Sequence, residues 1–263
     1  MRILVSGAGI AGPALCHWLI KYGHTPTLIE AAPRLRTGGY VIDFWGLGFD
    51  IAEKMGLLPK LKTIGYLVKD VKLVNSTGER VGGFSASLFE HMTHGRYLSL
   101  PRGELAAAIF RSIEGQVETL FGDRISAITD EKDAVAVRFE RGAPRTFDLV
   151  IGADGLHSGV RRLVFGELSR FEKFMGYYVA AFEVPGYRPR DELTYVMYNR
   201  PGVQVARFAM HDDRTLILFV FAATDDERIE DERRALHTRF ADAGWECPQI
   251  LAALDQSDSV YFD

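Results

Sequence analysis

Short apolar runs alternate with polar segments along the N-terminal part of the chain. The first run covers residues 2–6. A glycine-rich turn follows, and then a helical pattern over residues 10–22 with Pro13 in its first turn. A second apolar run covers residues 25–30. This order of strand, helix and strand predicts a βαβ unit, whose two strands are parallel.

The next segment mixes helical and alternating patterns. We predict a helix over residues 48–58, a hairpin over residues 71–84 and an irregular segment over residues 85–95. A short strand at residues 96–100 leads into a helix over residues 102–113. Four further strands are predicted, at residues 117–121, 124–129, 135–140 and 146–151.

The pattern changes after Gly166. Long runs rich in aromatic residues are separated by turns, which predicts an antiparallel sheet. Its strands are expected at residues 175–184, 193–198, 203–209 and 215–222. Helices are predicted over residues 225–240 and 248–254, and residues 260–263 resemble the start of another strand.

Composition excludes several classes of protein. The 263 residues are 47% hydrophobic and 25% charged, as in an ordinary globular protein. A net charge of −4 gives no basic field for nucleic-acid binding. Glycines and a proline interrupt the uncharged stretch at residues 3–20, so no membrane segment is predicted. Two cysteines form neither a disulfide framework nor a metal site, and we expect a cytoplasmic protein.

A glycine motif carries the first functional signal. Gly7, Gly9 and Gly12 form a G-x-G-x-x-G pattern between the first strand and the first helix, with Ala11 at the helix start. In such a turn a pyrophosphate approaches the backbone and the helix N-terminus. Glu30 ends the second strand, where a carboxylate can bind ribose hydroxyls. The sequence therefore predicts dinucleotide binding, against the alternative of a glycine turn that binds nothing.

The motif alone does not distinguish NAD from FAD, but later segments do. Arg36 follows in a Pro-, Arg- and Gly-rich loop, Arg102 opens a helix after a strand, and Asp154 lies in the segment Gly-Ala-Asp-Gly with Ser158 and Arg161 beyond it. In order and spacing these segments resemble the FAD-dependent aromatic hydroxylases, the single-component flavoprotein monooxygenases. The stretch over residues 38–43 is most similar to the branch that inactivates tetracyclines and tailors polyketides.

The resemblance implies roles for these residues. Glu30 would hold the adenosine ribose, Arg102 the phosphate or ribityl region of FAD, and Asp154 would lie near the pyrophosphate, with Arg36 also in the cofactor site. Two simpler interpretations stay open: Arg102 as a surface residue that begins a helix, and Asp154 as a helix cap.

The resemblance also implies the reaction. NADH or NADPH would reduce FAD transiently, and a flavin C4a-hydroperoxide would transfer one oxygen atom of O₂ to an aromatic or polyketide-like substrate. The cofactor performs this chemistry, so we assign no catalytic residue. The family's strand pattern suggests that Tyr178 and Phe219 face the flavin and the substrate; alternatively, both belong to the core under the sheet.

The expected fold is α/β, with a doubly wound, Rossmann-like FAD-binding domain (residues 1–68 and 96–172) and an antiparallel substrate-binding sheet (residues 69–95 and 173–263). The family's later Gly-Asp segment has no counterpart here. The sequence therefore suggests a C-terminally truncated chain with weakened FAD retention, monomeric or weakly self-associating. An NAD-dependent dehydrogenase and a catalytically silent nucleotide-binding module remain the alternatives.

Overall fold

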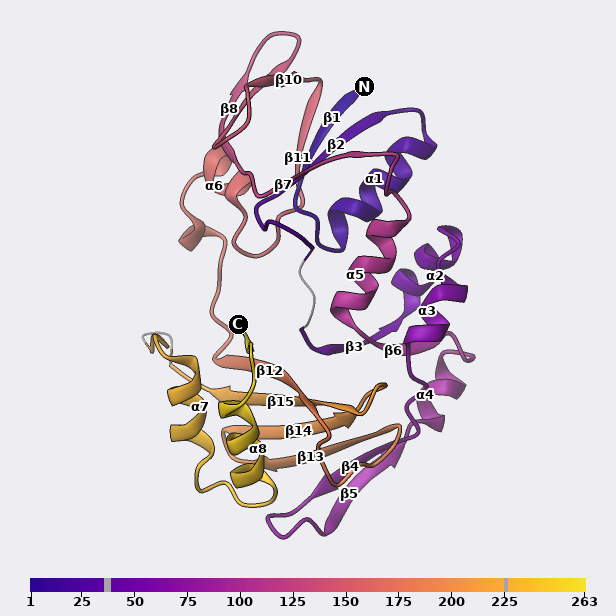
Figure 1. The fold of residues 1–263 in the computed structure, drawn as a ribbon, viewed down its shortest axis with the longest axis vertical. Helices are drawn as coiled ribbons and strands as arrows, with labels where there is room; N and C mark the ends of the chain where they lie inside the picture. The colour runs from indigo at the N-terminus through magenta and orange to yellow at the C-terminus, as the bar shows by residue number, and fades with distance from the viewer. Residues whose placement is uncertain (36–38, 225–226) are drawn as a thin grey trace. The chain divides into compact units, whose positions relative to one another are not determined.

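The computed structural model describes residues 1–35, 39–224 and 227–263 (Figure 1). The chain forms two compact units, each built from two stretches of sequence. The first unit contains Met1–Thr37 and Gly103–Lys173, and the second contains Gly38–Arg102 and Phe174–Asp263.

A parallel sheet forms the centre of the first unit. Its strand order is β11-β1-β2-β7, with bounds Leu149–Gly152, Arg2–Ser6, Thr25–Glu30 and Glu118–Phe121. Helix α1 (Ala11–Lys21) joins β1 to β2, and these two strands pair in parallel. The predicted βαβ unit is confirmed, and α1 ends as expected before Gly23, whose φ is +77°.

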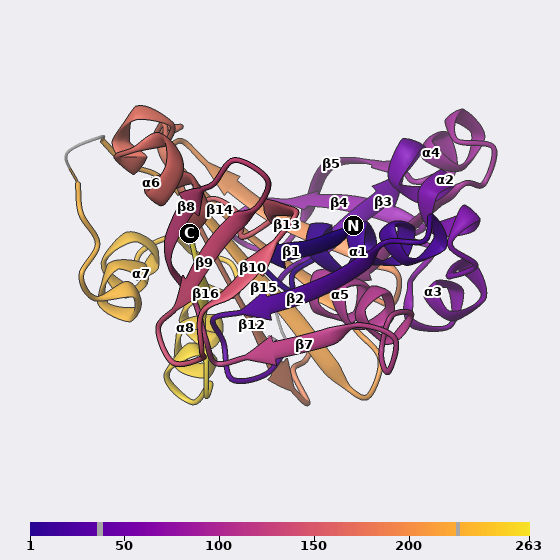
Figure 2. The ribbon, with the colours of Figure 1, turned by 90° about the horizontal axis from the view of Figure 1, so that it is seen from above.

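This sheet is covered on both faces. Ile3 and Val5 of β1 pack with residues of α1 and of α5 (Arg102–Arg111). Leu4 points to the opposite face, where it packs with Val137 and Phe139. That face is covered by an antiparallel sheet of β8, β9 and β10 (Ile125–Asp130, Val135–Phe139 and Arg145–Phe147), which lie side by side in Figure 2.

One predicted strand is two strands in the structure. The run over residues 146–151 was expected to be continuous, but β10 ends at Phe147 and β11 begins at Leu149. Asp148 separates them: its carboxylate accepts a hydrogen bond from the Arg2 N–H at 2.8 Å, and its own N–H donates to the Arg2 carbonyl at 2.9 Å. The chain thereby leaves the antiparallel sheet and enters the parallel one. Helix α6 (Gly159–Phe165) and the 3₁₀ turn Leu168–Arg170 follow.

A seven-stranded sheet forms the centre of the second unit. Its order is β16-β12-β15-β14-β13-β4-β5. The bounds are Tyr261–Phe262, Tyr177–Pro185, Arg214–Ala222, Val203–Ala209, Thr194–Arg200, Asp70–Val74 and Arg80–Ser85. All neighbouring strands are antiparallel except β13 and β4, which are parallel. The predicted antiparallel strands, the hairpin at residues 71–84 and the terminal strand are confirmed, but the consecutive strands β12 and β13 do not form a hairpin, because β15 and β14 lie between them.

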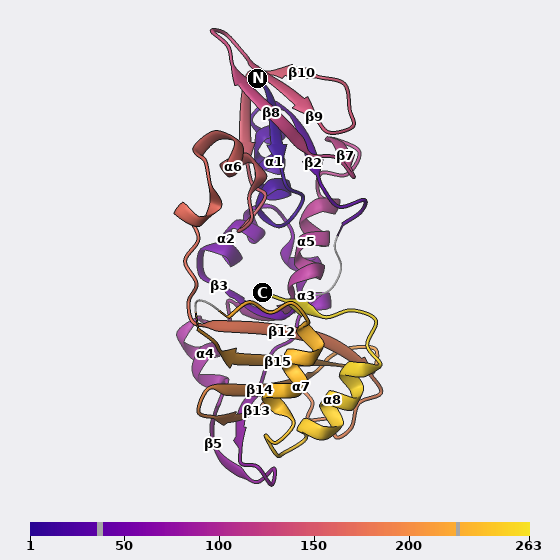
Figure 3. The same cartoon turned by 90° about the vertical axis from the view of Figure 1, so that its left-hand side faces the viewer.

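The two faces of this sheet are covered differently. Helices α7 (Glu232–Phe240) and α8 (Cys247–Asp255) lie against one face (Figure 3). On the other face, residues of the sheet pack with the ribbon formed by β3 and β6 (Val41–Trp45 and Tyr97–Pro101). Helices α2, α3 and α4 (Gly46–Lys54, Leu58–Ile64 and Ser87–Met92) complete the unit. The irregular segment predicted at residues 85–95 therefore contains a short helix.

The division into units differs from the expected domain boundaries. Residues 38–68 and 96–102 were expected in the nucleotide-binding domain, but they group with the second unit. The reason is packing: Tyr66 and Tyr97 are buried with Phe208 of β14 in one hydrophobic cluster. Local strand signals in the sequence do not reveal such a long-range contact.

Candidate functional site

The glycine turn after β1 has the geometry that its motif predicts. Gly7 has φ +106°, and a Cβ there would lie 2.5 Å from the carbonyl oxygen of Ala153. A Cβ at Gly12 would lie 1.9 Å from the carbonyl oxygen of Gly7 and 3.3 Å from Leu28 Cδ1. These two glycines are required by the fold itself, the first for the turn and the third for close contact between helix and strand.

Gly9 differs from its two neighbours in the motif. It is exposed, and a Cβ built there meets no protein atom within 4 Å. The fold therefore places no steric demand on this position. A ligand lying against the backbone would explain the glycine, and the open space beside Gly9 fits the pyrophosphate that this motif binds.

The start of α1 supplies donors next to this space. Ile10 is the N-cap residue, and no side chain caps the helix. The first intrahelical acceptor is the Ile10 carbonyl, which binds the Ala14 N–H at 3.3 Å. The N–H groups of Ala11 and Gly12 therefore have no acceptor within the helix, and Pro13 has no N–H to satisfy. Together with the helix dipole, they favour an anionic group.

Glu30 lies at the end of β2, as the sequence predicts, but its carboxylate also binds two backbone N–H groups. One oxygen accepts a hydrogen bond from the Ala8 N–H and the other from the Ala32 N–H, both at 2.8 Å. Glu30 thus ties the glycine turn to the loop that follows β2. Each carboxylate oxygen has a second lone pair, so ribose hydroxyls can still bind.

Asp154 is brought to the same turn. Strands β1 and β11 are neighbours, the Ala153 N–H donates to the Ser6 carbonyl at 2.7 Å, and a Cβ on Gly7 would lie 2.7 Å from the Asp154 Cα. The Asp154 carboxylate accepts from the Ser158 hydroxyl and, at 3.1 Å, from the Val160 N–H. The helix-cap interpretation therefore describes its side chain, while its backbone borders the glycine turn.

A pocket of about 420 Å³ adjoins Asp154 in the first unit. Its wall includes Arg161, whose Nε is buried without a hydrogen-bond partner among the described residues, and the ring of Phe171, 5.7 Å from the Arg161 guanidinium carbon. The backbone N–H of Arg161 donates to Ser158 Oγ at 2.9 Å, and this hydrogen bond caps the start of α6. The site thus carries a cation that the glycine motif alone does not indicate.

One predicted cofactor residue belongs to the other unit, and another is not described by the structure. Arg102 belongs to the second unit, where it is exposed and begins α5, and its N–H donates to the Tyr40 carbonyl at 3.0 Å. Arg36 lies outside the described residues. The structure therefore brings together Gly7, Gly9, Ala11, Gly12, Glu30 and Asp154 within one unit.

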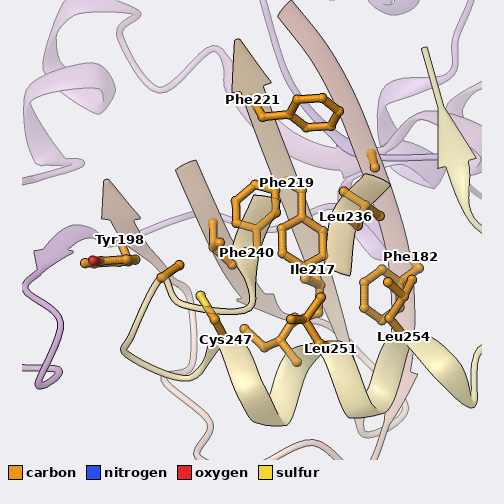
Figure 4. Packing of buried hydrophobic residues seen from close by; sticks show 14 of the residues in the cluster. Phe182, Tyr198, Ile217, Phe219, Phe221, Leu236, Phe240, Cys247, Leu251 and Leu254 are labelled. Atoms are coloured by element: carbon orange, nitrogen blue, oxygen red, sulfur yellow. The ribbon is translucent and has the colours of Figure 1, made fainter. Parts of the chain in front are cut away.

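The substrate role expected for Tyr178 and Phe219 needs correction. Phe219 is fully buried, and its ring lies 4.5 Å from that of Phe240 on α7 (Figure 4). Tyr178 packs on the same cluster, and its hydroxyl donates to the Glu227 carbonyl at 2.9 Å. Both side chains therefore contribute to the core between the sheet and its helices, because the helices cover the face to which they point.

The opposite face of the same strands offers accessible positions that the sequence interpretation missed. Leu218 and Val220 alternate with Phe219 on β15, so they point away from α7 and α8, and both are only partly buried. Val220 pairs with Val179 on one side and with Gln204 on the other. Period-two alternation separates these two faces, but it does not show which of them a helix covers.

The cysteine in the first helix belongs to the hydrophobic core. Cys16 is fully buried beside β1 and β2, and burial raises the pKa of its thiol to about 12. The thiolate is therefore absent at neutral pH.

Among the described residues, no helix is long and apolar enough to cross a membrane.

Comparison with known proteins identifies the family. Residues 1–246 match the FAD binding domain family. The Mycobacterium tuberculosis protein MT1298 is 34% identical over 99% of this chain and 72% of its own length. A flavin-dependent monooxygenase of Legionella longbeachae is 30% identical over the whole chain and 68% of its own length.

Solved structures agree with this result. The tetracycline destructase Tet(51) is 32% identical, with a TM-score of 0.82 over 100% of this chain and 68% of its own. Tet(55) is 29% identical, with a TM-score of 0.84 over 99% of this chain and 67% of its own. FAD is the cofactor of the matching family, and its phosphates fit the glycine turn described above. The chain therefore belongs to the FAD binding domain family, among the flavin-dependent monooxygenases.

Proposed function

We propose that this protein uses FAD, O₂ and NADH or NADPH to hydroxylate an aromatic or polyketide-like small molecule. The observation that carries the proposal is the open space beside Gly9, within a turn whose other two glycines are fixed by packing. The family match and the similarity to Tet(51) support the reaction class. A dehydrogenase that uses NAD as its only cofactor is disfavoured by the same family match.

We assign the protein's own residues to binding and positioning. The backbone at Gly9 and Ala11 would hold the FAD pyrophosphate, and Glu30 would accept hydrogen bonds from the adenosine ribose. The backbone of Asp154 would limit the space beside them. Bound FAD would supply the redox and oxygen chemistry, as expected from the sequence, so no side-chain nucleophile is required. Arg36 and Arg102 remain proposed contacts to FAD.

The reductant is proposed to be a nicotinamide dinucleotide. The pocket beside Asp154 supports this, because Arg161 supplies a cation to a carrier of phosphate groups. Exposed His157 lies within the same segment, with its Nδ1 3.2 Å from a Glu172 carboxylate oxygen.

The substrate is proposed to lie against the face of the seven-stranded sheet that carries Leu218 and Val220. This face presents apolar, partly buried side chains with Gln204 as a polar neighbour, which suits a flat organic molecule. Because Tet(51) and Tet(55) are named as tetracycline destructases, tetracycline is the first substrate to test.

The test is a turnover assay with the FAD-reconstituted protein. NADH and NADPH oxidation is followed with and without tetracycline and simple phenols, and products are identified by mass spectrometry. We expect stimulated oxidation together with a product that has gained one oxygen atom. Nucleotide oxidation that yields only hydrogen peroxide with every compound would contradict the proposed hydroxylation. FAD binding without any nucleotide oxidation would support a silent binding module instead.

A further inference from the structure

A second pocket, of about 400 Å³, lies in the other unit and has no part in the proposed reaction. It is on the face of the seven-stranded sheet that α7 and α8 cover, near the end of the sheet where the β4–β5 turn meets the loop before α8. Lys72, Asp191, Val196, Arg207, Trp245 and Glu246 are the lining residues that matter here. Pockets of this size bind small organic molecules.

The floor of this pocket is a row across three strands. Val196 of β13 pairs with Lys72 of β4 on one side and with Arg207 of β14 on the other. Side chains at paired positions point to the same face, and neighbouring strands lie about 4.8 Å apart. The sheet therefore places an ammonium and a guanidinium on either side of an apolar residue.

Arg207 is fixed in this row but retains donors. Its side chain is only 3% exposed. Its Nε donates to Glu246 Oε2 at 2.9 Å, and its Nη2 donates to Asp191 Oδ2 at 2.6 Å. Among the described residues, Nη1 has no hydrogen-bond partner. A guanidinium has five N–H donors, so this buried cation can still bind an acceptor in the pocket.

The two carboxylates at the site are already engaged. Asp191 lies between Arg207 and Lys72, with its Oδ1 3.9 Å from Lys72 Nζ. Glu246 Oε2 accepts from the Tyr187 hydroxyl at 2.8 Å as well as from Arg207. Arg190, also in the wall, is itself paired with Glu192 at 2.7 Å and with Asp213 at 3.3 Å, so Lys72 and Arg207 are the cations that face the pocket. A ligand carboxylate can accept charge-assisted hydrogen bonds from these two groups.

Trp245 gives the pocket a flat wall. The backbone N–H of Trp245 donates to the Ser76 carbonyl at 2.7 Å, which attaches this residue to the β4–β5 turn. Its indole lies against Gly78, where a Cβ would be 3.6 Å from Trp245 Cδ1. The Arg207 guanidinium carbon is 5.8 Å from the ring. An aromatic ring is therefore held next to the cations.

We infer that this pocket binds a small organic carboxylate with a flat apolar body, at a site separate from the proposed FAD site. The ligand carboxylate accepts hydrogen bonds from Arg207 Nη1 and from the Lys72 ammonium, and the apolar body lies against Trp245 and Val196. This site concerns ligand recognition and is independent of whether the protein is a monooxygenase.

Isothermal titration calorimetry of the FAD-saturated protein with benzoate tests the inference. Saturable binding is expected, and neutral benzamide should bind at least tenfold more weakly. Lys72→Met removes the accessible cation but keeps both Arg207 ion pairs, and it should weaken benzoate binding at least tenfold. Lys69→Met is the matched control, because Lys69 is exposed just before β4 and outside the pocket wall; it should leave the affinity unchanged.

Trp245→Leu provides a second reading and should also weaken benzoate binding at least tenfold. Equal affinity of wild type and Lys72→Met places the benzoate elsewhere, such as in the substrate site, and overturns the inference. No saturable binding at millimolar benzoate overturns it as well.

Discussion

The Gly9→Ala variant tests whether Gly9 is required for FAD binding or for folding. A Cβ at this position meets no protein atom within 4 Å, and Gly9 does not need a positive φ. The apoprotein should therefore keep its stability or gain about 0.4–1 kcal/mol, because alanine restricts the unfolded chain. The methyl group should instead occupy the space that the pyrophosphate takes.

The loss of FAD affinity can be estimated from the hydrogen bonds. Displacing a phosphate from two backbone N–H donors removes about 3 kcal/mol, at about 1.5 kcal/mol for each charge-assisted bond. This corresponds to a roughly hundredfold higher Kd. FAD titration of the apoprotein measures the Kd, and urea unfolding of the apoprotein measures stability.

The matched control is Gly82→Ala in the second unit. A Cβ there makes an ordinary contact, 3.5 Å from Leu73 Cδ1, and has no role in the proposed FAD site. It should change neither FAD affinity nor stability substantially. If Gly9→Ala binds FAD as tightly as wild type, the open space is not a pyrophosphate site. If it unfolds far more easily, Gly9 is required by the fold after all.

Three further predictions follow from individual contacts. Glu30→Ala leaves two backbone N–H groups without their acceptor, so it should lower the free energy of unfolding by about 1–3 kcal/mol. It should also weaken FAD binding roughly ten- to hundredfold. An unchanged free energy of unfolding in urea would contradict these two hydrogen bonds. Phe219→Ala should lower the free energy of unfolding by about 3–5 kcal/mol and leave the substrate KM unchanged, because Phe219 belongs to the core. Val220→Ala, on the other face of the sheet, should raise the substrate KM. A raised KM for Phe219→Ala with an unchanged KM for Val220→Ala would return Phe219 to the substrate site. Burial raises the pKa of Asp123, but hydrogen bonds from backbone N–H groups outweigh this effect and hold the pKa below its usual value. The ionised Asp123 carboxylate therefore stabilises the fold above its unfolded-state pKa, and this stabilisation is lost as the pH falls through its folded-state pKa. Asp123→Asn should flatten the acid end of the curve of unfolding free energy against pH, measured by urea unfolding, and an unaltered curve would refute this.

Local sequence signals predicted the first unit well. The strands at residues 2–6 and 25–30 have the expected bounds, because the glycine turn and the Gly23 cap fix where the intervening helix begins and ends. The three motif glycines were correctly associated with one turn. The sequence did not reveal that the Glu30 carboxylate binds two backbone N–H groups, since these bonds depend on how the turn and the following loop meet.

Long-range packing explains what the sequence could not predict. Phe219 and Val220 are both apolar and adjacent, so alternation assigns them to opposite faces without showing which face lies under α7. Similarly, Lys72 and Arg207 are far apart in sequence, and only the pairing of both with Val196 brings them into one row. The local sequence around Tyr66 and Tyr97 likewise does not predict that they are buried with Phe208.

Turnover under isotopically labelled dioxygen tests the proposed activity most directly. The FAD-reconstituted protein is incubated with NADPH or NADH and the substrate that stimulates nucleotide oxidation, and the product is analysed by mass spectrometry. We predict one labelled oxygen atom in each product molecule. A product oxidised without the label, or label found only in hydrogen peroxide, would contradict the assignment of this protein as a monooxygenase.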